Sequence, residues 1–204
     1  MKFFKVIRAI LKWPIRWIFR IKSTGAENVP EGGVILAANH TAMPDVVAIS
    51  VSTKRQVRYM AKVEAIRVPV IGRLLRACGA YPVDRGGMDV KSLKYTMKLI
   101  DSGEVIGIFP QGTRRPGLDP RTTEVKAGVG FIAYRTGADV VPVFLDSKKM
   151  RTAPFRRNRV IFGKVIKNEE LGFEKGGLAE YEAAAKIIFD RICALKYGEG
   201  EESE

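Results

Sequence analysis

Short apolar runs alternate with stretches of helical periodicity along most of the chain, and this alternation constrains the fold more than any other feature. Runs such as Val34–Ala38 are continuously apolar, which is typical of strands buried on both faces of a parallel sheet. Strands that alternate with helices form α/β folds. We therefore expect one α/β domain with a mixed, mostly parallel sheet flanked by helices.

The same pattern gives approximate bounds for the elements. Strands are predicted over Gly33–Ala38, Val57–Ala61, Ala80–Val83, Val105–Phe109, Val140–Leu145 and Arg159–Ile166. Helices are predicted over Val46–Val51, Arg67–Cys78, Asp89–Asp101, Lys126–Arg135 and Gly177–Leu195. The polar stretch Gln111–Thr123 is the predicted long loop, and long loops in compact domains often carry function.

Length and charge bound the number of domains and the kind of partner. A chain of 204 residues suits a single domain. The formal net charge of +13 favours an anionic partner, whether nucleic acid, anionic lipid or a phosphorylated substrate. Cys78 and Cys193 are far apart in the sequence with no second cysteine or histidine beside either, so they predict no redox pair or zinc site. We expect reduced, buried thiols in a cytosolic setting.

The amino-terminal segment, residues 1–22, is predicted to lie in the plane of a membrane surface. Its cations recur every three or four residues and so share one helical face: Lys2, Lys5, Arg8, Lys12, Arg16 and Arg20. Trp, Phe and Ile occupy the rest of the circumference, and Pro14 is expected to kink or divide the segment. No uninterrupted apolar run is long enough to span a bilayer. We expect an interfacial anchor; an amphipathic helix packed on the core is the alternative.

The rest of the chain divides into a folded domain and a tail. The folded domain is expected over residues 23–197. Residues 198–204 are mostly acidic and are expected to be disordered.

His40, the only histidine, follows Asn39 just after the apolar run that ends at Ala38, and it lies five residues before Asp45. Active sites of open α/β sheets form at the carboxyl ends of strands. Pro44 suits the first turn of a helix beginning near Asp45, so the chain can fold the carboxylate back against the imidazole. Such a carboxylate fixes the tautomer and leaves the other ring nitrogen free to accept a proton. Taken alone, the pair fits a strand-end histidine and a helix-capping aspartate at least as well.

Three further motifs accompany strand-like runs, and they favour a catalytic pair over a strand-end histidine and a helix-capping aspartate. They are Gly79-Ala80-Tyr81-Pro82-Val83-Asp84-Arg85, Phe109-Pro110-Gln111-Gly112-Thr113-Arg114-Arg115 and Val141-Pro142-Val143. Together with Asn39-His40 and Asp45 they resemble the ordered motifs N-H-x4-D, G-x5-R, F-P-E-G-T-R and V-P-V of the glycerophosphate acyltransferase superfamily. The resemblance is closest to bacterial 1-acyl-sn-glycerol-3-phosphate acyltransferases and covers roughly Gly25 to Phe144.

The resemblance implies an activity and a place for it. His40 would deprotonate the free hydroxyl of lysophosphatidate, and Asp45 would orient His40 and balance its charge. The hydroxyl would attack the thioester of acyl-CoA or acyl carrier protein, giving phosphatidate without an acyl-enzyme, a metal or a cofactor. Glycerol-3-phosphate or another lysophospholipid is the alternative acceptor. The setting would be the cytoplasmic face of the cell membrane, with an anionic phospholipid surface as partner and the enzyme peripheral or monotopic.

The resemblance also assigns substrate-binding residues. Arg85 and Arg114 would hold the phosphate, because a guanidinium binds phosphate oxygens bidentately. The Gly112–Thr113 backbone would approach it closely, and Lys126 would add charge at a helix start. Gln111 stands where the family usually has glutamate; its amide excludes an acid or base role and leaves a hydrogen bond to substrate glycerol or a neighbouring arginine open.

Other classes of protein fit less of the sequence. Nucleic-acid binding rests on the charge alone, because no helix-turn-helix, zinc finger or aromatic RNA-binding platform is present. A serine hydrolase lacks its G-x-S-x-G elbow. A non-catalytic membrane-binding module would need only residues 1–21 and a basic patch. That patch fits anionic lipid, CoA phosphates, acidic acyl carrier protein or a solvated face equally well: Lys148, Lys149, Arg151, Arg156, Arg157 and Arg159.

Overall fold

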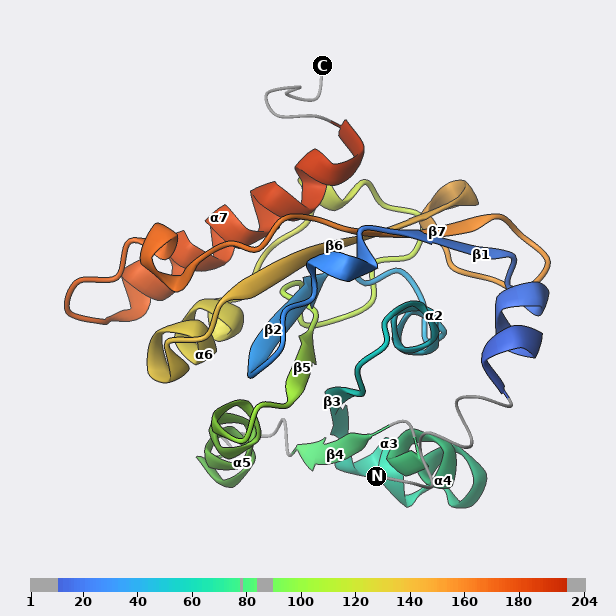
Figure 1. Ribbon diagram of the computed structural model, residues 1–204, viewed down its shortest axis with the longest axis horizontal. Helices are drawn as coiled ribbons and strands as arrows, with labels where there is room; N and C mark the ends of the chain where they lie inside the picture. The colour runs from blue at the N-terminus through green and yellow to red at the C-terminus, as the bar shows by residue number, and fades with distance from the viewer. Residues whose placement is uncertain (1–10, 78, 84–89, 198–204) are drawn as a thin grey trace.

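The computed structural model describes residues 11–77, 79–83 and 90–197, and it contains a seven-stranded sheet covered on both faces (Figure 1). The strand order is β1-β7-β6-β2-β5-β3-β4. Every neighbouring pair is parallel except β6 and β7, which are antiparallel. The strands are β1 (Ile21–Thr24), β2 (Val34–Ala38), β3 (Val57–Lys62), β4 (Ala80–Val83), β5 (Val105–Ile108), β6 (Val140–Ser147) and β7 (Asn158–Phe162). The predicted mixed, mostly parallel sheet is confirmed.

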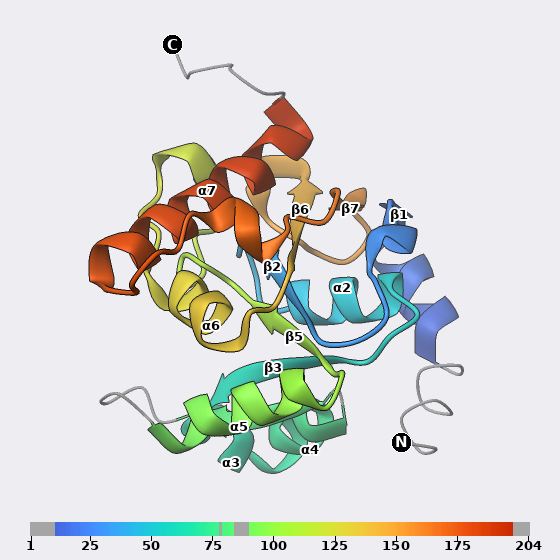
Figure 2. The same ribbon diagram turned by 60° about the vertical axis from the view of Figure 1, so that its left-hand side comes forward.

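Helices cover the two faces of this sheet, as Figure 2 shows from a second direction. They are α2 (Asp45–Ser52), α3 (Val63–Arg67), α4 (Pro69–Ala77), α5 (Val90–Asp101), α6 (Gly128–Thr136) and α7 (Leu178–Tyr197), preceded by a helical stretch over residues 11–18. Short 3-10 turns lie at η1 (Ala26–Asn28), η2 (Pro120–Thr122), η3 (Lys148–Met150) and η4 (Asn168–Leu171).

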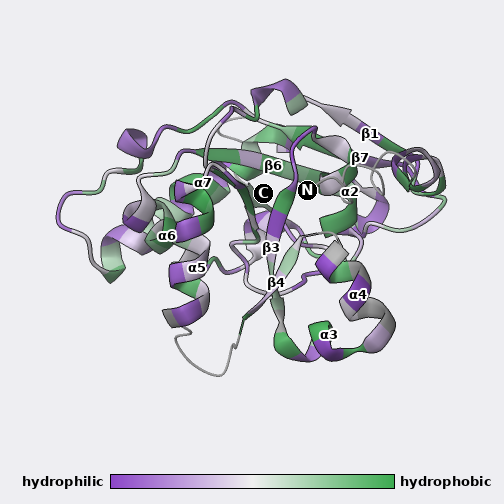
Figure 3. Ribbon diagram, turned by 60° about the horizontal axis from the view of Figure 1, so that its bottom comes forward, coloured by the Kyte–Doolittle hydropathy of each residue, from purple (hydrophilic) through white to green (hydrophobic). Residues whose placement is uncertain are grey.

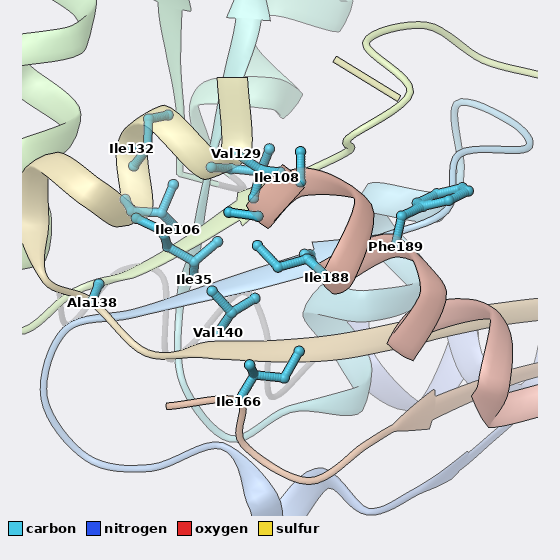
Figure 4. Packing of buried hydrophobic residues seen from close by; sticks show 14 of the residues in the cluster. Ile35, Ile106, Ile108, Val129, Ile132, Ala138, Val140, Ile166, Ile188 and Phe189 are labelled. Atoms are coloured by element: carbon cyan, nitrogen blue, oxygen red, sulfur yellow. The ribbon is translucent and has the colours of Figure 1, made fainter. Parts of the chain in front are cut away.

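The central strand β2 is buried along its whole length, and its side chains alternate between two apolar clusters. Ile35 and Ala37 belong to the cluster formed with α5, α6 and α7, which Figure 4 shows around Ile106 and Ile188. Val34, Leu36 and Ala38 belong to the cluster on the α2 side. In Figure 3 the strand β6 is largely hydrophobic, whereas hydrophilic segments recur on α5 and α6. Burial on both faces is the physical reason for the continuously apolar strand sequences.

The structure corrects three predicted boundaries. The helix predicted over Arg67–Cys78 begins at Pro69 as α4, because Pro69 disfavours helical geometry at Val68, and the separate short helix α3 that ends at Arg67 was not predicted. The strand predicted over Arg159–Ile166 ends at Phe162, where the next position faces Pro142, which has no N–H to donate. β1 was not predicted; it begins at Ile21, inside the range 1–22 expected for the anchor.

The described part of the segment 1–22 combines features of the two predictions, an interfacial anchor and an amphipathic helix packed on the core. Residues 11–18 form one helix through Pro14, without the predicted division. Ile15 and Phe19 pack against the α2-side cluster, while Trp13 and Trp17 face outward. No helix in the described part of the chain is both long and apolar enough to cross a bilayer. Residues 1–10 and the predicted tail 198–204 lie outside the described residues.

Candidate active site

His40 lies just beyond the carboxyl end of β2, beside the carboxyl end of the neighbouring parallel strand β5. Because parallel strands end on the same edge of the sheet, the turn after β2 and the loop after β5 meet there. This edge therefore holds the His40 motif and the Phe109–Arg115 motif together, as the sequence predicts. The motif that begins at Gly79 runs through β4 and continues to Arg85, which lies outside the described residues.

The predicted pairing of His40 with Asp45 is present. The two side chains approach to 2.9 Å between Nδ1 and Oδ2. The carboxylate is fully buried, and its Oδ2 also accepts from the backbone N–H groups of Thr41 (2.6 Å) and Ala42 (2.8 Å). α2 begins at Asp45 directly after Pro44, so the proline turn folds the carboxylate back as expected. Because a carboxylate only accepts, the neutral imidazole of His40 has its hydrogen on Nδ1, and in this tautomer Nε2 is the nitrogen that can accept a proton.

Thr41 extends this pairing toward a distant part of the chain. Its hydroxyl donates to Asp45 Oδ1 at 3.1 Å. Thr152 lies 3.2 Å away through both its hydroxyl and its backbone N–H. Since Thr41 has one hydroxyl hydrogen and uses it on Asp45, the Thr152 hydroxyl is the donor between the two. The turn that carries the dyad is thus fixed to the connection between β6 and β7.

The loop after β5 holds the backbone of His40 on both sides. Gln111 Oε1 accepts from the His40 N–H at 2.7 Å, and the N–H of Arg115 donates to the His40 carbonyl at 2.8 Å. The Gln111 amide donates in turn to Thr123 Oγ1 at 2.7 Å, and Thr123 donates to Pro120 O. Gln111 is buried and does not line the cavity. Its hydrogen bonds are made to His40 and Thr123, and none is made to an arginine among the described residues.

Phe109 fixes the plane of the imidazole. Its ring stacks on His40 with centroids 3.9 Å apart and an interplanar angle of 14°. Tyr59 of β3 stacks behind Phe109 at 6.0 Å. Gly107 permits this arrangement, because a Cβ there would come within 2.1 Å of the Tyr59 ring. Stacking on one side and the hydrogen bond to Asp45 leave His40 little rotational freedom.

A cavity of about 590 Å³ opens beside His40. Its volume is typical of pockets that bury a small ligand, which enclose about 300 to 1,000 Å³. Following the strand order, its wall runs from His40 across β5 and β3 to β4 and the helices α3 and α4. The lining beyond His40 is mainly apolar and includes Met60, Ala65, Leu75, Ala80, Ile108, Val129 and Ile132. Such a wall suits a hydrocarbon chain.

Polar and cationic groups line another part of the same cavity. Gly112, Thr113, Arg114 and Lys126 all contribute, and so do the first residues of α6, Gly128 and Val129. Gly112 adopts a φ of 67°, which suits a glycine in the turn. Lys126 Nζ is 3.3 Å from Glu124, and its backbone N–H donates to Pro110 O. Two cations beside a helix amino terminus favour an anion between them.

Several residues of the site were given no individual role by the sequence, although Asn39 and Phe109 belong to the motifs quoted above. Thr41, Phe109, Thr123 and Thr152 hold the dyad or its loop, and the apolar cavity wall comes from separate elements. Asn39 joins β2 to β6, because its amide donates to Leu145 O and accepts from Leu145 N–H. Asn39 and Thr41 flank His40 in the sequence, and this position is the one sequence signal of their roles.

Of the two cysteines, Cys193 lies in the described part of the chain. Cys193 is free and buried, as predicted, and burial raises its pKa to about 12. Cys78 lies outside the described residues. The described residues contain no group of three or more His, Cys, Asp or Glu side chains arranged to hold a metal.

A strand-end histidine is paired with a buried aspartate next to a cavity that has an apolar wall and a cationic part, and this is the arrangement that a general base acting on an anionic lipid would need. Comparison with known proteins agrees. Residues 20–146 match the family model described as Acyltransferase. The chain is 33% identical over 153 residues to the 1-acyl-sn-glycerol-3-phosphate acyltransferase of Bacillus subtilis, covering 74% of this chain and 73% of that protein. The chain belongs to this acyltransferase family.

Two further relatives extend the comparison. The protein of the same name from Borreliella burgdorferi is 32% identical over 151 residues, which cover 70% of this chain and 58% of that protein. The crystal structure of a 1-acyl-sn-glycerophosphate acyltransferase from Thermotoga maritima matches with a TM-score of 0.68 and 18% identity. The match covers 98% of this chain and 84% of the Thermotoga maritima chain, and it shows that the two share a fold.

Proposed function

We propose that the protein moves a fatty acyl group from acyl-CoA or acyl carrier protein to the free hydroxyl of 1-acyl-glycerol-3-phosphate, giving phosphatidate. The observation that carries the proposal is the His40–Asp45 pair beside a cavity that has both an apolar wall and a cationic part. A lysophosphatidate carries one acyl chain and one phosphate, and therefore matches both. The names of the curated relatives support the same acceptor.

The reaction then follows from the tautomer of His40. Nε2 takes the proton of the acceptor hydroxyl as the oxygen attacks the thioester carbonyl carbon. The carbon–sulfur bond breaks, the thiolate leaves, and the proton held by His40 returns to the sulfur. Asp45 balances the charge of the imidazolium that forms between these steps, while Phe109 keeps the ring in plane. The acyl donor is a co-substrate, and the reaction as written uses no cofactor.

The cationic part of the cavity is assigned to the phosphate. Arg114 offers a guanidinium, Lys126 an exposed ammonium that would exchange Glu124 for the phosphate, and the start of α6 backbone N–H groups. Gly112 and Thr113 bring the backbone close to the same place. Arg85 belongs to this set by the motif that contains it. Gln111 positions His40 instead of touching the acceptor.

The proposed setting is the cytoplasmic face of the cell membrane, with the enzyme bound peripherally or monotopically to anionic phospholipid. The proposed lipid substrate and product carry acyl chains that partition into a bilayer, which supports a membrane setting. Trp13 and Trp17 remain on the outside of the helix over residues 11–18 after Ile15 and Phe19 have packed on the domain. Exposed tryptophans beside cations are suited to the headgroup region.

An assay that crosses donors with acceptors tests the proposal. The purified full chain is given acyl-CoA or acyl carrier protein donors, in mixed anionic micelles with lysophosphatidate, glycerol-3-phosphate or other lysophospholipids. We expect thiol release and phosphatidate by mass spectrometry with lysophosphatidate, and a loss of about a thousandfold or more in His40→Ala. The surface variant Leu178→Asn should retain activity. Turnover by His40→Ala close to the parent would refute the base, and vesicle binding without any turnover would indicate a non-catalytic membrane module.

A further inference from the structure

The connection between β6 and β7, residues 148–157, has an unusual backbone. Lys149, Met150 and Phe155 have φ values of 59°, 43° and 58°, in the left-handed region that non-glycine residues rarely adopt. The remaining described non-glycine residue with positive φ is Arg20, which follows the helix over residues 11–18. Such conformations cost free energy and persist at places where the surroundings and the function require them. All of them occur in these two segments.

Hydrogen bonds join the two segments side by side, and Figure 1 shows the connection passing beside this helix. The N–H of Phe155 donates to the carbonyl of Ile18 at 2.6 Å. Asn158 donates from its side chain to Phe19 O at 2.5 Å and from its backbone to Arg20 O at 3.5 Å. Phe155 and Asn158 thus bind the carbonyl of Ile18, the last residue of the helix, and those of Phe19 and Arg20 directly after it.

The two segments also carry the most exposed large apolar side chains of the described residues. Trp17 is 77% exposed, Trp13 72% and Phe155 71%. Trp13 and Trp17 are four residues apart and therefore share one face of the helix. An aromatic ring that is exposed on a strained loop makes few packing contacts within the domain. The arrangement therefore suits a surface that becomes buried in a membrane.

The connection that carries Phe155 also carries cations for which the described residues provide no acidic partner. The side chains of residues 148, 149, 151, 156 and 157 are Lys or Arg and all are exposed. The nearest acid in the sequence, Asp146, is occupied by Arg159 at 2.6 Å and Lys196 at 3.1 Å. The charge of Arg159 is therefore paired with Asp146, and the basic patch consists of the other five cations. Cations beside exposed aromatic rings are the combination that anionic lipid headgroups and the acyl boundary both favour.

The other side of the connection touches the catalytic turn. Thr152 hydrogen-bonds Thr41, which itself holds Asp45. The carbonyl of Met150 accepts from the N–H of Gly117 in the loop after β5 at 3.1 Å. The same ten-residue stretch therefore adjoins the amino-terminal helix on one side and the dyad's turn on the other.

We infer that residues 148–157 form a second membrane-contact element, in which Phe155 enters the interface of an anionic phospholipid bilayer beside Trp13 and Trp17 while the five cations contact headgroup phosphates. The inference rests on the proposed function for its membrane setting. Acyl carrier protein or CoA would match the cations but would not bury three aromatic rings. The element holds the catalytic turn next to the surface that supplies the lipid acceptor.

Vesicle binding of the full chain tests the inference. The probes are vesicles of phosphatidylglycerol with phosphatidylcholine, and vesicles of phosphatidylcholine alone, at low and high salt. Phe155→Asn removes the ring and keeps a residue that tolerates positive φ; Arg156→Gln/Arg157→Gln removes two charges. The matched controls are Leu178→Asn, an exposed apolar residue on α7, and Lys91→Gln/Lys94→Gln on α5. Circular dichroism checks that each variant is folded.

The expected result is a loss of about tenfold in affinity for anionic vesicles in Phe155→Asn. We expect about tenfold in the double arginine variant at low salt, and less at high salt. The controls should bind like the parent. Phe155→Trp keeps an aromatic ring and should also bind like the parent, unlike Phe155→Asn. Parent-like binding by both loop variants would overturn the inference. Unchanged vesicle binding with lost turnover from acyl carrier protein would also overturn it and assign the patch to the donor.

Activity is measured separately with a short-chain acceptor and acyl-CoA without vesicles. Phe155→Asn should match the parent there, and a loss equal to that on vesicles would show that the ring serves the chemistry and would overturn the inference. If the parent has no turnover but the vesicle results hold, the proposed function fails and the membrane-contact element stands.

Discussion

His40 Nδ1 donates to Asp45 Oδ2 across 2.9 Å, and Asp45 receives this bond while fully buried and without a lysine or arginine partner in the described structure. The carboxylate is satisfied instead by Thr41 and Ala42. A buried carboxylate held by neutral donors keeps its charge available to a single histidine. One short turn would thus supply both the orientation and the charge of the proposed base.

Asp45→Asn should separate these two contributions. The amide oxygen can still accept from His40, so the fold and the tautomer are retained, but the imidazolium formed during transfer loses its negative neighbour. We expect kcat to fall about a hundredfold or more with little change in KM. Steady-state kinetics on the folded variant measure this. Asp190→Asn on the exposed face of α7 is the control, and a fall of less than tenfold in Asp45→Asn would contradict the role.

Gln111 is predicted to act through the backbone of His40. Gln111→Ala removes the acceptor of the His40 N–H and the donor to Thr123, which should lower the free energy of unfolding by about 1 to 3 kcal/mol and lower kcat. Gln111→Glu keeps the acceptor, and the Thr123 hydroxyl can turn to donate to it, so this variant should lose less activity.

A double-mutant cycle with Thr123→Val measures the coupling between the two side chains. We expect about 0.5 kcal/mol or more in urea unfolding. If Gln111→Glu loses as much activity as Gln111→Ala, the side chain has a role that the hydrogen bond to His40 does not describe.

The sequence predicted the parts of the site that depend on local order. Continuous apolar runs indicated buried parallel strands, and Pro44 between His40 and Asp45 indicated the turn that brings them together. These inferences hold because strand burial and proline geometry act within a few residues. The ends of β2 and β5 then had to meet, since neighbouring parallel strands end on one edge.

The remaining parts depend on contacts between distant segments. Thr152 reaches Thr41 across 111 positions, and no pattern near either residue signals the contact. β1 is a four-residue edge strand that follows a segment with helical charge spacing, and it is defined by its pairing with β7. The cavity wall comes from β3, β4, β5 and four helices, so its extent follows from packing alone.

The far end of the cavity is predicted to set the acyl-chain length. Ala65 and Leu75 line it beside β4, the strand farthest from β2 on that side of the sheet. Ala65→Leu adds bulk there and should lower kcat/KM for long chains about tenfold while sparing short ones. Leu75→Ala should favour longer chains. Competition between acyl chains of different length gives the ratio directly, and an equal loss for all lengths would place these residues outside the chain path.

Asp146 gives the fold a pH dependence, because it joins β6 to Arg159 of β7 and Lys196 of α7. Burial alone would raise the pKa of Asp146, but the hydrogen bonds from Arg159 and Lys196 outweigh it and lower the pKa below its usual value. A carboxyl with a lower pKa in the folded state binds fewer protons when folded. It therefore stabilises the fold above its unfolded pKa of about 3.9, and this contribution is lost as the pH falls through the folded pKa.

Asp146→Asn should accordingly lower the free energy of unfolding by about 1 to 2 kcal/mol at neutral pH. The difference from the parent should shrink as the pH falls below about 4, where the parent carboxyl also becomes neutral. Urea unfolding across this range measures both curves. Asp190→Asn, which removes the exposed pair with Lys186, should change stability by less than about 0.5 kcal/mol at any pH. A difference between parent and Asp146→Asn that stayed constant with pH would assign the effect to packing and not to charge.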